Sequence, residues 1–593
     1  MVSPLFPQIV TTKKPDGRTY RYLHIVESYR DGNTVKKRRI ASLGNIDAYS
    51  EKEILQIIEK LESLLQHRAR GSAEDLEPHQ TVQFGVPYVV QFLWDQIGLT
   101  DILRDALKDR DVTFDVARYI QAMVIGRLVD PSSKLHLFET LENLYLPESG
   151  EPWQLQHFYR ALDYIMDIKP ELERALYTRL TDLLSFRLSL VLYDVTSTHV
   201  TGHHCPIAQH GYSRTHRPDL EQVELGLLVT PEGLPITHEV FPGNTADKQT
   251  VPQILERLRR EFAVDQCVFV GDRGMVTERN ISLLREAGFP YIVGYHKRGR
   301  IVSDQLLEKF QDLSRFASIQ DNLWYLEVPA SEVDDDEKEP DTRYILCYNP
   351  VKAEQDAAYR ESALEEAQRA LDELSTRLTQ PRRGRKLTMQ GVMLKVADIL
   401  TRRGMEAFFE VEYDGGRLHW TRVEEAIRRE VLRDGKFIVK TNTTLSADEV
   451  VRSYKTLMGV ERAFREIKNS LEVGPMYHWN ERRVRGHIFV CVLAYLFEQE
   501  LQVLYRRSLD AEMQKAMDMT EESERESKLR GLEKKRYTGA KIVQELGRWG
   551  ALKASFLGKT FLSVPPAPPI VADVMKRLGI PHPSKMIELA PTN

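Results

Sequence analysis

Residues 188–200 read LSLVLYDVTSTHV, a strongly apolar run that is typical of a buried β-strand. Asp194 interrupts this run. Burying a lone carboxylate costs several kcal/mol unless a cation or hydrogen-bond donors meet it. Asp194 is therefore a candidate functional residue, and a turn or capping aspartate is the structural alternative.

The next hundred residues alternate between strand and helix patterns. After the first strand we expect a hairpin of two strands, residues 222–230 and 234–241, with its turn at Pro231-Glu232-Gly233. A helix at 250–262, a short strand at 267–272, a second helix at 277–288 and a last strand at 291–295 should follow. The short strand, CVFVGD, ends in Asp272. In an open α/β sheet the carboxyl end of a strand faces a crevice, so Asp272 is a second candidate.

A third acid lies in residues 446–471, SADEVVRSYKTLMGVERAFREIKNSL, which predict one long helix. Its buried stripe is expected to consist of Leu457, Val460, Phe464, Ile467 and Leu471. Tyr454, Glu461 and Lys468 follow one another at intervals of seven and so share a neighbouring face. Alone, this pattern also fits an exposed helix with ordinary salt bridges.

Together these motifs resemble the RNase H-like catalytic core of DDE transposases. The matching segments are YDVTSTHVTG, GYSRTHRPDLEQVELGLLV, FPGNTADKQT, GDRGM and VERAFREIKNSL, within residues 188–496. The helix resembles the Tyr-Arg-Glu-Lys signature of the insertion-sequence-four superfamily, with Tyr454, Glu461 and Lys468 in place. The signature arginine position holds Leu457, and Arg462 or Arg465 could substitute for it.

The resemblance implies a transposase that cuts and rejoins DNA with two Mg²⁺ or Mn²⁺ ions held by Asp194, Asp272 and Glu461. Carboxylates suit these hard cations. Asp194 would bridge the ions, and each of the other acids would hold one. Tyr454 and Lys468 would contact DNA phosphate near the cut. The implied partners are the terminal inverted repeats and the target DNA, bound by at least a dimer because two ends are cut together.

Two basic clusters are further candidates for DNA backbone contact, although each could equally be a solvated face. They comprise Arg482, Arg483 and Arg485, and Arg382, Arg383, Arg385 and Lys386. Relatives in the superfamily stack a flipped base on a tryptophan of an insertion domain. Trp324 and Trp420 are the local candidates for that role, but a core position is the simpler interpretation.

The chain of 593 residues is too long for one core, and we expect an α/β multidomain protein. The predicted parts are a small basic β-rich unit, a helical domain, an RNase H-like core in two segments around an insertion domain, and a helical C-terminal region. The β-rich unit covers residues 1–48 and the helical domain 49–184. The core consists of residues 185–296 and 431–497, the insertion domain covers 297–430, and the C-terminal region covers 498–593. The helical domain, with patterns such as EILQIIEKLESLL and VARYIQAMVIGRL, would serve either for packing or for binding the DNA ends.

The composition is that of an ordinary globular protein, with a formal net charge of −5. A slightly acidic chain argues weakly against nucleic acid, so local clusters must provide the positive charge. No signal peptide or run of about twenty uninterrupted apolar residues is evident, which predicts a location in the bacterial cytoplasm, with the nucleoid. The four scattered cysteines fit a reducing compartment. His203, His204 and Cys205 are more typical of a polar loop than of a zinc site.

Two other functions remain open from the sequence. One is a metal-dependent nuclease of the same fold that does not join strands. The other is a DNA-binding protein that is derived from a transposase and has lost the chemistry, although all three acids are present here.

Overall fold

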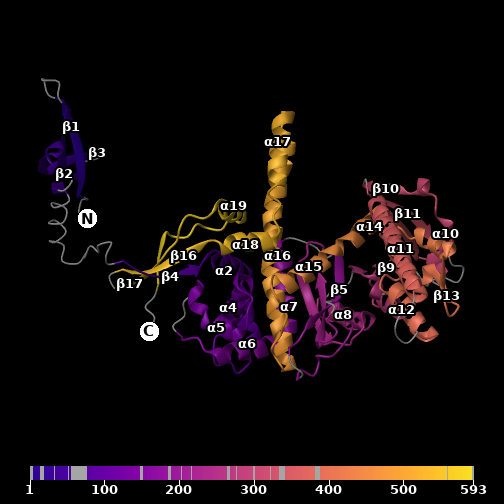
Figure 1. The fold of residues 1–593 in the computed structure, drawn as a ribbon. Coiled ribbons are helices and arrows are strands. Elements are labelled where there is room, and N and C mark those ends of the chain that lie inside the picture. Colours follow the sequence, from indigo (N-terminus) through magenta and orange to yellow (C-terminus); the bar gives the residue numbers. More distant parts are fainter. Residues whose placement is uncertain are drawn as a thin grey trace. The chain divides into compact units, whose positions relative to one another are not determined.

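The computed structural model describes residues 5–13, 19–31, 34–50, 53–54, 76–146, 151–184, 189–201, 204–214, 217–262, 267–275, 277–297, 301–320, 322–332, 341–380, 387–556 and 559–589. The chain divides into two compact units. The first comprises Met1–Glu77 and Ser555–Lys559, and the second comprises Pro78–Ala554 and Thr560–Asn593. Figure 1 shows the elements of both units.

The first unit contains an antiparallel sheet of three strands, β1 (Leu5–Lys13), β2 (Thr19–Asp31) and β3 (Thr34–Asn45), in the order β1-β2-β3. The basic run Lys36–Arg39 lies on β3. Arg38 of this run forms an ion pair of 2.6 Å with Glu27 on β2. The predicted helix EILQIIEKLESLL lies outside the described residues apart from its first two, Glu53 and Ile54.

The second unit contains most of β4 (Leu76–Gln83), and then a group of helices. These are α2 (Gly85–Ile97), α3 (Leu99–Leu107), α4 (Val116–Val129), α5 (Lys134–Glu139), α6 (Leu155–Asp167) and α7 (Lys169–Leu184). α4 is buried on almost all sides because it lies at the centre of this group. Its first turn is capped by Asp115, whose carboxylate accepts a hydrogen bond of 3.2 Å from the Arg118 amide.

A nine-stranded sheet follows, in the order β10-β11-β12-β15-β9-β8-β5-β6-β7. Its first five strands along the chain are β5 (Leu190–His199), β6 (Gln222–Val229), β7 (Pro235–Pro242), β8 (Val268–Gly271) and β9 (Tyr291–Tyr295). β5, β6 and β7 pair antiparallel, whereas β5, β8 and β9 pair parallel. Helix α8 (Asp247–Glu261) leads from β7 to β8 and helix α9 (Glu278–Glu286) from β8 to β9, in the order of strands and helices that the sequence predicted.

The two faces of this sheet belong to different cores. On β5, Val191, Tyr193 and Val195 pack against α8 and α9, while Leu190 and Leu192 point into the main core on the other face. Helix α15 (Met458–Asn469) covers that second face. Alternation along a strand therefore places Asp194 on the same side as Leu192, facing α15.

The segment that was predicted as an insertion domain contributes to two structures. β10 (Ala317–Gln320), β11 (Leu323–Pro329) and β12 (Arg343–Tyr348) extend the main sheet through β15 (Lys436–Thr441), and α10 (Ile301–Lys309) packs beside them. The rest forms its own hydrophobic cluster from α11 (Pro350–Thr379), α12 (Met389–Thr401), β13 (Phe409–Tyr413), β14 (Leu418–Arg422) and α13 (Glu424–Val431). The acidic sequence DDDEKE at residues 334–339 lies outside the described residues.

The predicted helix of residues 446–471 is two helices, α14 (Ala447–Thr456) and α15, which meet at Leu457. The predicted stripe is confirmed, because Leu457, Val460, Phe464, Ile467 and Leu471 are all buried. The expectation of one straight helix is wrong: Tyr454 lies on α14 and Glu461 on α15.

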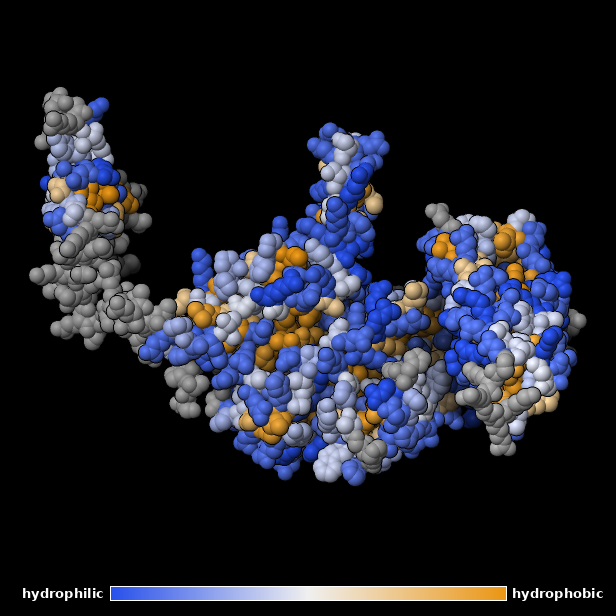
Figure 2. Space-filling model, viewed as in Figure 1, coloured by the Kyte–Doolittle hydropathy of each residue, from blue (hydrophilic) through white to orange (hydrophobic). Residues whose placement is uncertain are grey.

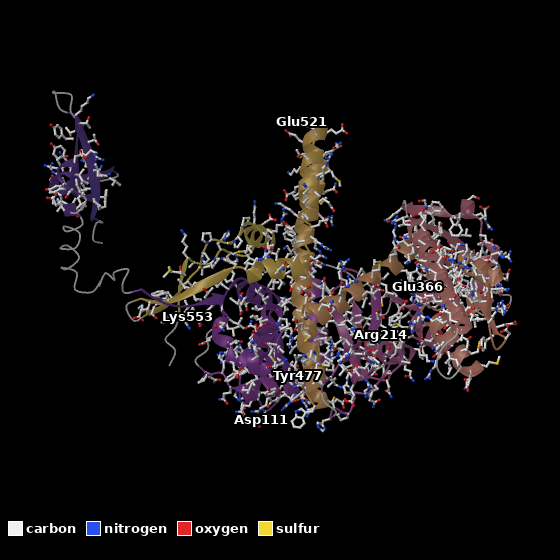
Figure 3. The ribbon with its side chains drawn as sticks, viewed as in Figure 1. Asp111, Arg214, Glu366, Tyr477, Glu521 and Lys553 are labelled. Carbon is white, nitrogen blue, oxygen red and sulfur yellow. The ribbon has the colours of Figure 1, made fainter. Side chains whose placement is uncertain are left out.

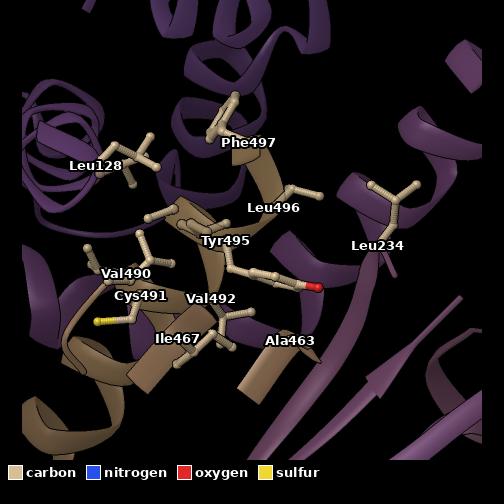
Figure 4. Packing of buried hydrophobic residues seen from close by; sticks show 14 of the residues in the cluster. Leu128, Leu234, Ala463, Ile467, Val490, Cys491, Val492, Tyr495, Leu496 and Phe497 are labelled. Carbon is tan, nitrogen blue, oxygen red and sulfur yellow. The ribbon is translucent and has the colours of Figure 1, made fainter. Parts of the chain in front are cut away.

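Helix α16 (Glu481–Met517) runs through the main core, between the group α2–α6 and the sheet (Figure 1). Figure 4 shows its residues Val490–Phe497 packed near Leu128 of α4 and Ile467 of α15. Among the described helices it is the one that is long and apolar enough to pass for a membrane span, but 94% of that stretch is buried inside the protein.

The C-terminal region contains the helices α17 (Glu522–Glu533), α18 (Gly539–Gly547) and α19 (Pro569–Leu578). It is not wholly helical, as the sequence had suggested. β16 (Gly550–Phe556), β17 (Lys559–Ser563) and β18 (Met586–Glu588) form a sheet with β4, in the order β18-β17-β16-β4. Figure 2 shows mostly hydrophilic residues over α17, of which only Leu532 is buried.

Candidate active site

Asp194 and Asp272 lie next to each other on neighbouring parallel strands. Tyr193 of β5 is in register with Gly271 of β8, so the residues that follow them are side by side. Val268 and Val270 belong to the main core, and Asp272 continues their alternation onto the face that α15 covers. The pairing of β5 with β8 thus brings Asp194 and Asp272, two of the three predicted acids, close together.

The surroundings of Asp194 disfavour its charge. Burial, and to a smaller degree the neighbouring Asp272, raise the pKa of the Asp194 carboxyl to about 7. The carboxylate accepts a hydrogen bond of 2.7 Å from the Val195 amide, which partly offsets the burial. A buried carboxylate beside a second one is a site that a cation would stabilise.

Tyr454 lies close to the other two acids. Burial raises the pKa of the Tyr454 hydroxyl above its usual range, and the charges of Asp272 and Glu461 raise it further. The hydroxyl also lies against Gly294 of β9, where any side chain would collide with it. The phenol is therefore kept protonated and can donate a hydrogen bond to an anionic group.

Glu461 lies on the first turn of α15 and is exposed. Within the described part of the chain, its carboxylate forms no hydrogen bond or ion pair. No three His, Cys, Asp or Glu side chains of the described residues lie close enough together to hold one metal ion. The three acids therefore face one region but do not form a preassembled ligand set.

Lys468, in the last turn of α15, reaches the sheet beside Asp194. Its ammonium group donates a hydrogen bond of 2.7 Å to the Thr196 hydroxyl, two residues beyond Asp194 on the same face of β5. Burial, and then the charge of Arg214, lower the pKa of Lys468 to about 8. A cation thus lies on the Asp194 side of the site and the Tyr454 hydroxyl on the Asp272 side.

Arg214 is a site residue that the sequence analysis did not single out. It lies between β5 and β6 and forms ion pairs with Glu224, at 2.6 Å, and with Asp247 at the start of α8. Figure 3 labels its position. Its charge acts on both Asp194 and Lys468. The motif GYSRTHRPD, which contributed to the family resemblance, was the available signal.

The other predicted DNA-binding arginines have different surroundings. Arg462 and Arg465 are exposed on α15, and their charges act on the buried Glu466. The arginine whose charge acts on Asp194 is Arg214. Arg482 and Arg483 are bound to Asp163 of α6, where Arg483 forms an ion pair of 3.0 Å. These last two cations fix the start of α16 to α6.

Two further groups from the sequence analysis are also placed. Arg485 is bound to Glu481 and to the Val240 carbonyl. The cluster Arg382, Arg383, Arg385 and Lys386 lies outside the described residues, as does His203.

The two candidate tryptophans do not occupy core positions, which was the simpler interpretation of the sequence. Trp324 lies beside Tyr348, with ring centroids 5.7 Å apart, and the Trp420 indole donates a hydrogen bond of 3.1 Å to Asp372. Both side chains are half-buried.

Two family descriptions match the chain. Residues 8–81 match the N-terminal domain of the IS1634 family transposases, a match that runs past the predicted boundary at residue 48. Residues 185–497, more than half of the chain, match the transposase DDE domain. A comparison with curated proteins found no match. All three acids lie within the segment that matches the DDE domain. The chain therefore belongs to the DDE transposases of insertion sequences.

Proposed function

We propose that this protein moves an insertion sequence by cut and paste, through metal-dependent cleavage of DNA and transfer of the cut strand. The observation that carries the proposal is the pair Asp194 and Asp272, side by side on parallel strands and facing the helix of Glu461. The sheet order β7-β6-β5-β8-β9 supports an RNase H-like core. The spacing of Tyr454, Glu461 and Lys468 supports a place in the insertion-sequence-four superfamily.

The donor set fits divalent metal ions. Mg²⁺ and Mn²⁺ prefer carboxylate oxygens, and the burial that disfavours the charge of Asp194 would be offset by a bound cation. Asp194, Asp272 and Glu461 would hold two such ions. When bound, they would activate the attacking oxygen and stabilise the leaving oxygen of the phosphodiester. The exposed Glu461 side chain would turn towards the aspartates as the ions bind.

The remaining groups position the DNA strand. The Tyr454 hydroxyl, kept protonated by its neighbours, donates to a phosphate oxygen on the Asp272 side. Lys468, held by Thr196, balances negative charge on the Asp194 side. Arg214 holds Glu224 and Asp247, so that these acids do not compete with the aspartates for a cation.

The partners follow from the proposed reaction. The protein would bind the terminal inverted repeats and the target DNA in the bacterial cytoplasm. It would do so as a homodimer, because both ends of the element must be cut together. Arg462 and Arg465, which are exposed on α15, are the arginines best placed to contact the backbone of this DNA.

The test is strand transfer of a pre-cut end, made from the repeats that flank the gene, in Mg²⁺ or Mn²⁺. We expect Asp194→Asn, Asp272→Asn and Glu461→Gln each to reduce joining by at least about 100-fold. Asp398→Asn, which changes an exposed acid on α12, is the matched control. Full joining by either aspartate variant would refute the assignment of the site. Cleavage without joining by the wild-type protein would identify a nuclease instead.

A further inference from the structure

A cavity of about 550 Å³ lies away from the three acids, where the segment 472–479 passes in front of the α4–α5 connection. Its walls include Arg127, Lys134, Tyr159, Tyr477, Trp479 and His487. The volume lies within the range of pockets that bind small organic groups. The lining combines cations with aromatic rings, and none of the short motifs that carry the family resemblance includes these six residues.

Two cations, Lys134 and Arg127, form part of the inner wall of the cavity. Lys134 and Arg127 are 4% and 5% exposed, and within the described residues neither forms an ion pair. The Arg127 guanidinium donates to the backbone carbonyls of Ser132, Leu471 and Glu472. Burial, and then the charge of Arg127, lower the pKa of Lys134 to about 7. Two buried cations side by side are costly unless an anion joins them.

The hydrogen-bond pattern leaves Lys134 able to bind such an anion. His487 donates from Nε2 to the Val473 carbonyl, at 3.1 Å, so its Nδ1 accepts the hydrogen bond of 2.6 Å from the Lys134 ammonium. One of the three Lys134 donors is used in this way. Burial, and then the Lys134 charge, lower the pKa of His478 to about 3, so this neighbouring ring is neutral and adds no further positive charge.

The outer wall presents aromatic rings to solvent. Tyr477 and Trp479 are 68% and 71% exposed, which is unusual for side chains of this size. The backbone beneath them is held in place, because the Thr201 amide donates a hydrogen bond of 2.7 Å to the Met476 carbonyl. Figure 3 labels Tyr477 near the start of α16. Exposed rings on a fixed backbone are a suitable surface for stacking a nucleobase.

The cavity is also connected to the active site through the backbone. Val200, which follows β5, forms a parallel bridge with Met476, so this segment lies alongside the end of the strand that carries Asp194. Six residues separate Val200 from Asp194, which at the rise of a β-strand is roughly 20 Å. A DNA strand that passes the aspartates can therefore reach the cavity.

We propose that this cavity binds one unstacked nucleotide of a DNA strand, with the phosphate at Lys134 and Arg127 and the base against Tyr477 and Trp479. The inference rests on the proposed function only in taking DNA as the substrate. The cations supply the charge-assisted hydrogen bonds that a phosphate oxygen accepts, and the rings supply stacking without a preference for sequence.

The experiment uses the full chain, with EDTA present so that cleavage plays no part, and a single-stranded oligonucleotide that carries 5-iododeoxyuridine. Near-ultraviolet light should crosslink the base to Tyr477 or Trp479, and peptide mapping identifies the residue. Trp479→Ala should weaken binding by roughly 5-fold or more, and Trp479→Phe should restore most of it. Tyr359→Ala, which removes an exposed ring on α11, should change nothing.

The phosphate contact has a separate readout. Lys134→Met keeps the length of the side chain, and the slope of log K against log salt should fall by about 0.7. An unchanged slope, or crosslinks confined to other segments, would overturn the proposal. So would equal or tighter binding of thymidine monophosphate, because the cavity would then serve a free nucleotide.

The same binding assays with the Asp194→Asn protein keep this inference separate from the proposed function. Crosslinking that persists in this variant shows that the cavity acts independently of the metal ligands. Loss of crosslinking in a folded Asp194→Asn protein would overturn the separate site.

Discussion

At the scale of single residues, the site combines Asp194, an acid whose charge burial disfavours, with cations that lie close to it. Asp194 and Asp272 are close because their strands are parallel and in register. Lys468 and Arg214 approach from a helix and from a connection. The protonation of Asp194 and of Lys468 therefore depends on the charges of the other residues around the site.

Arg214 gives the first prediction at this scale. Arg214→Met leaves the buried Glu224 without its cation and removes a charge that favours ionised Asp194. We expect strand cleavage to fall by about 100-fold, with partial recovery in Arg214→Lys. The matched control is Arg217→Met, since Arg217 lies in the same segment but forms an exposed ion pair with Asp219. An equal effect of both changes would contradict a specific role for Arg214.

Glu500 gives a prediction about pH. Its side chain is fully buried, neither carboxylate oxygen has a hydrogen-bond partner in the part of the chain that the structure describes, and burial raises its pKa to about 8. The folded protein therefore holds a proton that the unfolded chain, with an ordinary pKa of about 4.3, releases. The free energy of unfolding should fall as the pH rises from about 4.3 to 8, and stay reduced above that.

The Glu500→Gln variant removes this dependence. Relative to the wild type, it should gain about 4 kcal/mol between pH 5 and pH 9, measured by thermal or denaturant unfolding. Glu354→Gln, at an exposed position on α11, should show no such trend. A parallel pH dependence of wild type and Glu500→Gln would show that Glu500 is ionised in the folded protein.

Part of the site could be predicted from these residues and part could not. An acid inside an apolar run is visible in the sequence, and alternation fixes the face of the sheet on which it lies. The position of Glu461 relative to the aspartates depends on how α15 docks on the sheet, which spacing does not determine. Arg214 was missed because a residue in a connection has no periodicity that reveals where its side chain points.

At the scale of elements, helix contacts depend on small residues at a few points. Gly486 of α16 packs on α6, and a Cβ there would lie 2.5 Å from the Leu162 carbonyl oxygen. Gly539 of α18 meets the Glu498 carbonyl in the same close manner. These positions set how closely the helices around α16 can approach.

Gly486→Ala should therefore lower the stability by about 1–3 kcal/mol, because α16 and α6 must move apart. Thermal unfolding measures the loss. Gly531→Ala is the matched control, since nothing lies within 4 Å of the added methyl group on α17. In that helix alanine is the better residue and should raise the stability by up to about 1 kcal/mol. A stabilising Gly486→Ala would contradict the close contact.

The elements themselves were predicted unevenly. The order of strands and helices from β5 to β9 follows from short apolar runs between clear turn signals. The break between α14 and α15 was not predicted, because the apolar stripe continues through Leu457 without interruption. β16–β18 were missed because their partner, β4, lies more than 450 residues earlier in the chain.

At the scale of the whole molecule, the chain consists of two units of very different size. The three-stranded sheet of the first unit has its own hydrogen bonds, and the main core of the second unit contains none of its residues. The sequence predicted a boundary at residue 48, whereas the first unit extends to Glu77 and includes Ser555–Lys559. The sheet that joins β10–β12 to β15 was not, because pairing between distant strands leaves no local pattern.

A variant that lacks residues 1–50 should consequently keep the unfolding temperature of the larger unit. We expect a change of less than about 2 °C in calorimetry, since the removed residues contribute nothing to the main core. The matched comparison is Leu493→Ala in α16, which removes buried volume from that core and should cost about 2–5 kcal/mol. A large loss of stability on deletion would show that the two units fold together.

The course of α16 through the main core also has a consequence during synthesis. Helices α2–α7 are made within the first third of the chain, but the helix against which they pack begins only at Glu481. At about 5–20 residues per second, a ribosome needs roughly 15–60 s to translate the intervening stretch from residue 184 onwards. Throughout that interval the nascent helices expose the apolar faces that α16 will later cover. Chaperones that bind such surfaces on the emerging polypeptide would therefore govern how much of this transposase reaches its native state.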